Sequence, residues 1–96
     1  DGTFLGLRVK TIATVGAYMS VFGPWPAFAN AGGLAGVYRT PAIYTEIICT
    51  LTNTPTIGPY RGAGRPEASF SIEMAIDLAA RKLGMDRIEL RRKNMI

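Results

Sequence analysis

The chain has 96 residues, enough for one small domain, and its 48% hydrophobic and 19% charged residues are typical of a globular protein, not a disordered one. The formal net charge of +4 permits an anionic partner without requiring one. The absence of histidine excludes Ser-His-Asp and Cys-His catalysis, and a single cysteine excludes an internal disulfide.

The first half of the chain predicts two strands and a connector. Alternating apolar and polar residues predict a strand at residues 4–18. Residues 21–39 form an irregular connector, broken by prolines and glycines, in which Pro26 is suited to begin a short helix. The same breaks argue against a membrane span. Within the connector, Trp25 and Phe28 are expected to be packing anchors and not the wall of a substrate pocket.

Residues 43–52 give the clearest strand pattern, because β-branched residues dominate both faces. Cys49 shares one face of this strand with Ile47 and Leu51, so we expect a buried thiol that acts as a small hydrophobe. Glu46 lies on the opposite face and is expected to meet solvent or a neighbouring strand.

A helix is predicted at residues 66–83, with proline at its first position and Gly84 as its stop. The expected apolar stripe consists of the residues at helical spacing: Ala68, Ile72, Ala75, Ile76, Ala79 and Leu83. Glu73 and Asp77 are predicted on the exposed face, with Asp77 paired to Arg81.

A second helix is predicted to start at a cap formed by Asp86, with Glu89 at the spacing of a capping box. Five basic residues between Arg81 and Arg92 are expected to form a solvated face. The order strand, connector, strand, glycine loop, helix, helix indicates an α+β fold. Both ends of the chain fall inside regular patterns, so residues 1–96 are expected to be a fragment of a single domain in a larger polypeptide.

The loop at residues 58–65 holds the most informative pattern, because glycines and two cations precede a helix N-terminus. The first N–H groups of a helix lack internal partners and carry partial positive charge. Gly62 and Gly64 allow a ligand to approach the backbone closely, and Arg61 and Arg65 add full charges. This arrangement suits a large anion or an oxo-rich group.

A tight strand-to-helix turn explains the same glycines without a ligand. The Walker pattern is absent, and the loop lacks the third glycine of a dinucleotide fingerprint. Glu67 lies in the first helical turn, where a carboxylate stabilises the helix dipole; a catalytic role is the less favoured interpretation.

The segment TNTPTIGPYRGAGRPEASFSIEMAIDLAARKLGMDRIELRRKNMI resembles the molybdenum hydroxylases, which include xanthine dehydrogenase and aldehyde oxidase. The specific signature is YRGAGRPE at residues 60–67, and DGTFLGLRVKTIATVGAY resembles the strand before the family's active-site segment. The closer branch is the bacterial large subunits of the carbon-monoxide-dehydrogenase-like type. The resemblance implies a fragment of the molybdopterin-binding domain.

That resemblance implies roles for residues of the loop. Arg61, Gly62, Gly64 and Arg65 would contact the cofactor, with the backbone of Arg61 near the oxygen ligands of molybdenum. Ala63 would line the substrate pocket where xanthine-oxidising members carry phenylalanine, which puts purine stacking in doubt. True carbon monoxide dehydrogenases carry a copper-binding cysteine at the position of Gly62, so carbon monoxide oxidation is not expected.

The resemblance also implies a molybdenum–molybdopterin cofactor, in its cytosine dinucleotide form, with iron–sulfur clusters and FAD on partner subunits or domains of an oligomeric enzyme. The reaction would hydroxylate an aldehyde or N-heterocycle with oxygen from water. The family's glutamate base lies outside this chain, so the chain has no catalytic residue and is expected to be inactive alone. A cytoplasmic enzyme is expected, with the periplasm left open.

Two alternatives remain at this point. One is a non-catalytic anion-binding or interaction module that uses the glycine loop and the basic C-terminal helix. The other is a degenerate, structural copy of the family domain. No nucleic-acid partner is predicted, and a nucleic-acid module would show a steep loss of affinity with salt.

Overall fold

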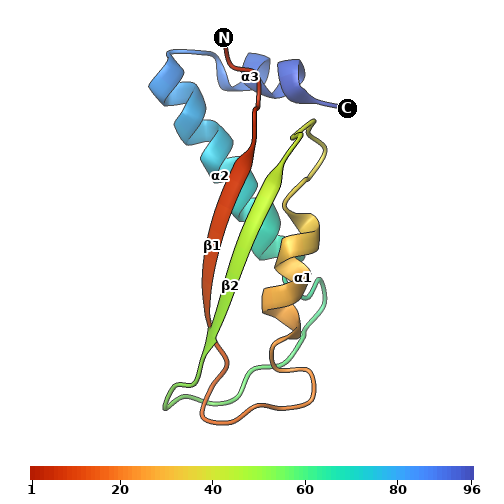
Figure 1. Cartoon of the computed structure of the whole chain (residues 1–96), viewed down its shortest axis with the longest axis vertical. Helices are drawn as coiled ribbons and strands as arrows, with labels where there is room; N and C mark the ends of the chain where they lie inside the picture. Colours follow the sequence, from red (N-terminus) through yellow and green to blue (C-terminus); the bar gives the residue numbers. More distant parts are fainter.

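The computed structural model describes residues 1–96 and contains two strands and three helices (Figure 1). In chain order these elements are β1 (Leu7–Thr14), α1 (Trp25–Gly33), β2 (Ile43–Thr50), α2 (Arg65–Leu83) and α3 (Arg87–Asn94). The predicted α+β fold and order of elements are confirmed, and the connector contains the helix α1. None of the helices is long and apolar enough to cross a membrane.

The two strands pair in parallel, from Leu7 opposite Ile43 to Thr14 opposite Thr50 (Figure 1). Parallel neighbours need a crossover connection, and α1 supplies it. The first strand is shorter than predicted because β2 offers partners only along that register. Lys10 lies opposite Glu46 with their charged atoms 3.4 Å apart, so Glu46 meets the neighbouring strand as expected.

Beyond the strands, the two connections run side by side at the carboxyl ends of the sheet (Figure 1). The Ala17 amide donates to the Thr54 carbonyl at 3.0 Å, and the Thr56 hydroxyl donates to the Tyr18 carbonyl at 2.8 Å. These bonds hold the segment after β2 against the segment that leads into α1. The glycine loop is thereby brought to the start of α1.

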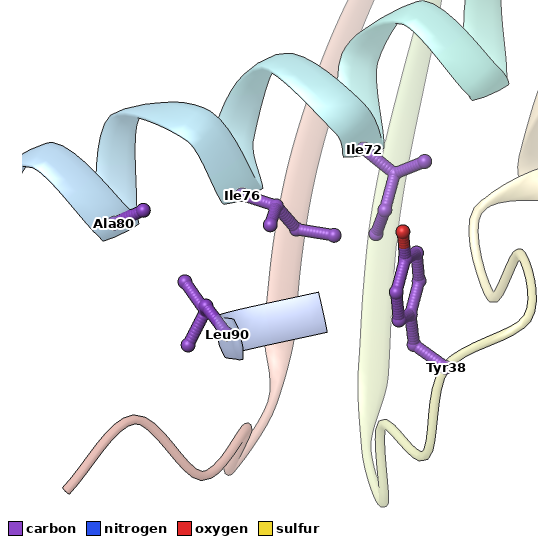
Figure 2. Close-up of a cluster of buried hydrophobic side chains, with 5 residues drawn as sticks. All are labelled: Tyr38, Ile72, Ile76, Ala80 and Leu90. Carbon is purple, nitrogen blue, oxygen red and sulfur yellow. The ribbon is translucent and has the colours of Figure 1, made fainter. Parts of the chain in front are cut away.

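The core lies between α2, α3 and the segment before β2 (Figure 2). Its α2 members recur every fourth residue: Ala68, Ile72, Ile76 and Ala80 are buried. Tyr38 and Leu90 complete the cluster from outside α2. The predicted stripe was wrong at Ala75 and Leu83, which are exposed, because the covered face of α2 follows the four-residue row, with Ala79 partly buried at its edge.

Helix α3 begins as predicted, because the Asp86 side chain accepts hydrogen bonds from the Ile88 and Glu89 amides at 2.8 and 3.0 Å. Its last turn holds the buried Asn94. The Asn94 side chain accepts from the Phe4 amide and donates to the Gly2 carbonyl, both at 2.8 Å. The N-terminal segment is therefore fastened to α3.

The prediction that Glu73 and Asp77 lie on an exposed face was wrong, as was the pairing of Asp77 with Arg81. Arg91 lies between them, with contacts of 2.8 Å to Glu73 and 2.7 Å to Asp77. Tyr38 donates to Glu73 at 2.6 Å. Helix α3 crosses this side of α2, so Arg91 is mostly buried while the other basic residues of the predicted solvated face are exposed.

This network shifts three ionisation equilibria. Burial opposes the charge on Arg91, but hydrogen bonds from its guanidinium to Asp77 and Glu73 hold its pKa above the ordinary value. The same hydrogen bond lowers the pKa of Asp77. Burial, together with the Glu73 carboxylate, raises the pKa of Tyr38. The charged forms of Arg91 and Asp77 are thus the ones that the fold stabilises.

Two packing predictions were also wrong. Cys49 is exposed, because the two-stranded sheet leaves every residue of β2 at least partly accessible. Trp25 and Phe28 are 56% and 57% exposed, because α1 buries the face that carries Ala27 and Asn30 instead. Neither aromatic residue is a packing anchor within this chain.

We expect acid to weaken the attachment of α3. Backbone hydrogen bonds from Glu89 and Ile88 lower the pKa of Asp86, and Arg91 lowers that of Asp77. Because the pKa of each carboxyl group is lower in the folded than in the unfolded chain, its charged form stabilises the fold. This stability is present above about pH 4 and is lost as the pH falls through the folded-state pKa. Amide exchange in α3, followed from pH 6 downward, checks this. In an Asp86→Asn variant, which keeps a cap that does not titrate, the acid loss should be smaller.

Candidate functional site

The candidate site is the loop between β2 and α2, which turns sharply before the helix. Gly62, Ala63 and Gly64 have φ angles of +95°, +38° and +89°. The Ala63 amide donates to the Tyr60 carbonyl at 2.9 Å, and the Arg65 amide donates to the Gly62 carbonyl at 3.0 Å. The left-handed angle of Ala63 costs about 1–2 kcal/mol, so the loop holds a strained residue at its centre.

Main-chain donors are left open around this turn. The amides of Gly62, Gly64 and Glu67 donate no hydrogen bond within the chain, and Gly64 caps α2 without a side chain. Pro66 has no N–H to satisfy. The N-terminus of α2 therefore presents unpaired N–H groups together with the positive end of the helix dipole.

The loop borders a surface cavity of about 350 Å³. Of the residues singled out in the sequence, Arg61, Ala63 and Gly64 line it. Gly62 and Arg65 do not, and the Arg65 guanidinium instead donates to the Gly62 carbonyl at 3.4 Å. The structure thus brings three of the five predicted site residues to one cavity.

Gly64 also meets the backbone of α1. A Cβ atom at this position would lie 2.0 Å from the Pro26 oxygen and 2.7 Å from the Asn30 nitrogen. The sequence predicted that this glycine lets a ligand approach, but the nearest neighbour in this chain is a helix. Gly64 is the residue that allows the starts of α1 and α2 to touch.

The charges at the cavity are mixed. Arg61 and Arg65 are exposed cations, and Glu67 places an exposed carboxylate in the first turn of α2. No three His, Cys, Asp or Glu side chains lie close enough together to hold a metal ion. Within this chain the loop therefore offers N–H groups and cations, which suit anionic oxygens, and no cluster of metal ligands.

Sequence reasoning missed the contribution of α1. Pro26 lines the cavity beside Tyr60 and Ile57. The signal that could have found it was topological: in parallel sheets, ligand sites lie beyond the carboxyl ends of the strands. Recognising the two strands as parallel neighbours would have placed the start of α1 beside the glycine loop.

Comparison with known proteins identifies the domain. Residues 1–95 match the sequence profile of the molybdopterin cofactor-binding domain. The chain belongs to this family, within the molybdenum hydroxylases. The resemblance seen in the sequence is therefore confirmed.

Named relatives of this molybdopterin cofactor-binding domain are oxidoreductase subunits. The chain is 39% identical over 99% of its length to a probable xanthine dehydrogenase subunit of Bacillus subtilis, covering 13% of that protein. It is 33% identical over its whole length to the 6-hydroxypseudooxynicotine dehydrogenase complex subunit gamma of Paenarthrobacter nicotinovorans, covering 12% of it.

Solved structures agree with this assignment. The aldehyde oxidoreductase of Desulfovibrio gigas superposes with a TM-score of 0.82 at 33% identity, over 99% of this chain and 10% of that one. Carbon monoxide dehydrogenase from Oligotropha carboxidovorans gives a TM-score of 0.80 at 33% identity, over 99% and 12%. This molybdopterin cofactor-binding domain thus corresponds to a small part of each relative.

Proposed function

We propose that this chain is part of the large subunit of a molybdenum-dependent hydroxylase and supplies one loop of its molybdopterin site. The observation that carries the proposal is the open N-terminus of α2, where unpaired main-chain amides lie in and next to a loop that borders a cavity. The family membership and the oxidoreductase relatives support it. In this interpretation residues 1–96 are one piece of a single larger domain.

The residues of the loop fit the cofactor as a set of donors. Molybdopterin carries phosphate and metal-bound oxygens, which accept hydrogen bonds, and the loop offers N–H groups and two arginines. We assign the Gly62 amide and the Arg61 backbone to the oxygens nearest the metal, and Gly64, which lines the cavity without a side chain, to the cofactor site beside them. The Arg65 side chain, which already reaches over the loop, would add charge.

Ala63 is assigned to the substrate pocket, because it lines the cavity and its methyl group leaves room for a substrate. When bound, the cofactor supplies two-electron oxidation with oxygen from water. This chain's own task is to orient that group by backbone donors, and it contributes no catalytic base. The substrate would be an aldehyde or an N-heterocycle, and the isolated chain would be inactive.

The relatives support a proposal about the partners of this chain. One belongs to a dehydrogenase complex and others are molybdenum-binding subunits, which favours a multi-subunit enzyme. We propose that iron–sulfur clusters and FAD on partner subunits or domains accept the electrons, that the cofactor is the cytosine dinucleotide form, and that the enzyme is cytoplasmic.

The test is the molybdenum and pterin content of the complete subunit, purified from its own host. About one molybdenum and one pterin per chain is expected, and screening with aldehydes and N-heterocycles would follow. If both are absent in a host that loads a control molybdenum enzyme, the proposal fails. That result would favour an anion-binding module or a degenerate, structural copy of the family domain.

We expect Gly62→Val to reduce cofactor content more than Arg61→Lys. Gly62 has φ +95°, and a side chain there would lie 3.1 Å from the Pro66 ring. A valine at this backbone angle strains the loop by about 1–2 kcal/mol, which corresponds to about a tenfold loss of affinity for the cofactor. Arg61→Lys keeps the backbone and a positive charge, so its pterin content should stay close to that of the wild type. Equally mild effects of both changes would contradict a role of the loop backbone.

A further inference from the structure

Asn30 is a buried polar residue in α1 that lies under the glycine loop. Asn30 is only 8% exposed, and its side-chain Oδ1 atom has no hydrogen-bond partner in the chain. Leaving such an atom unpaired is unfavourable, and most buried polar groups have a partner. Asparagine is also a poor residue for a helix interior. Neither packing nor helix formation explains its presence.

The position of Asn30 points to the loop. It lies one helical turn after Pro26, on the same face of α1. Pro26 lines the cavity, and the Asn30 backbone nitrogen would be 2.7 Å from a Cβ atom on Gly64. Side chains in a helix lean toward its N-terminus, so the Asn30 amide group leans toward the turn of α1 that carries Pro26.

The loop offers a donor for this oxygen. Among the unpaired amides of the loop, that of Gly64 belongs to the residue in contact with α1. We propose that Asn30 is a positioning residue whose Oδ1 accepts a hydrogen bond from the Gly64 amide when the loop is seated in the loaded site. The bond fixes Gly64 and leaves the Gly62 and Glu67 amides free for the cofactor. This inference rests on the proposed function.

The test compares two near-isosteric variants in the complete cofactor-loaded subunit: Asn30→Asp keeps an oxygen acceptor and Asn30→Leu removes it. Hydrogen exchange at the Gly64 amide is the main measurement. We expect Asn30→Leu to exchange about two- to tenfold faster than wild type and to release pterin faster, whereas Asn30→Asp keeps slow exchange. Asn30→Ala replaces the leucine variant if leucine prevents folding.

The controls separate this role from a structural one. Gly32→Ala changes the same helix where a Cβ meets nothing, and it should leave exchange at Gly64 unchanged. Without cofactor, Asn30→Leu should match or exceed the wild-type unfolding temperature, because the unpaired oxygen is gone. Equal exchange in the leucine and aspartate variants of a loaded enzyme overturns the inference alone. A wild-type subunit without molybdenum and pterin overturns the proposed function and this inference with it.

Discussion

Replacing Gly64 with alanine is expected to destabilise the domain by about 2–5 kcal/mol and to remove molybdenum and pterin from the complete subunit. Its φ of +89° costs an alanine about 1–2 kcal/mol. The new Cβ would overlap the Pro26 carbonyl, which belongs to helix backbone and cannot rotate away. Helices α1 and α2 would have to separate, and overpacking of this kind costs about 1–3 kcal/mol.

Unfolding of the cofactor-free subunit and its metal content after expression measure this effect. Gly84→Ala is a matched control, because Gly84 has φ +65° but its Cβ would meet nothing. The control should lose only about 1–2 kcal/mol of stability and keep its cofactor. If Gly64→Ala is no worse than Gly84→Ala, the contact between α1 and the loop is not what requires glycine.

Local patterns predicted most elements of the fold. Proline near the first position and glycine after the last marked both ends of α2, and the Asp86 cap marked the start of α3. These signals act through neighbouring residues, so a single sequence contains them. The buried row of α2 was only partly predicted, because which residues are covered depends on α3 and Tyr38.

Contacts between distant segments could not be predicted in the same way. The carboxylates of Glu73 and Asp77 have the spacing of a solvated helix face, and only the crossing of α3 brings Arg91 to them. Burial of Cys49 was predicted from alternation alone, which does not reveal how much of a strand is covered.

In the candidate site, too, local features could be predicted from the sequence and contacts between distant segments could not. The sequence placed the loop correctly before a helix N-terminus, and Arg61 and Ala63, two of the residues it singled out, line the cavity. It could not show that Gly64 meets α1, because Pro26 and Asn30 are far from it in the chain. The parallel pairing of β1 and β2 creates that contact, and pairing is a property of the whole fold.

Asn94→Ala is expected to cost about 2–3 kcal/mol, the largest effect outside the site. Asn94 is only 3% exposed. Its side chain accepts a hydrogen bond from the Phe4 amide and donates to the Gly2 carbonyl and, at 2.9 Å, to the Leu90 carbonyl. Alanine would leave the first two groups without these partners. Because Phe4 packs against the core and its ring meets Tyr38 edge-on, the loss should spread to the core cluster.

Hydrogen exchange at Phe4 and in α3, with the unfolding temperature of the complete subunit, measures the effect of Asn94→Ala. Lys93→Ala is the matched control, because Lys93 also joins α3 to the N-terminal segment, through the Asp1 carbonyl at 2.7 Å, but at the surface. Exposed pairs contribute about 0–1 kcal/mol, so this control should change little. Similar losses in the two variants would mean that the attachment of the N-terminal segment depends on its total number of bonds. A loss confined to Asn94→Ala would mean that one buried amide, with its donor and acceptor both hydrogen-bonded, holds the N-terminal segment before β1 against α3.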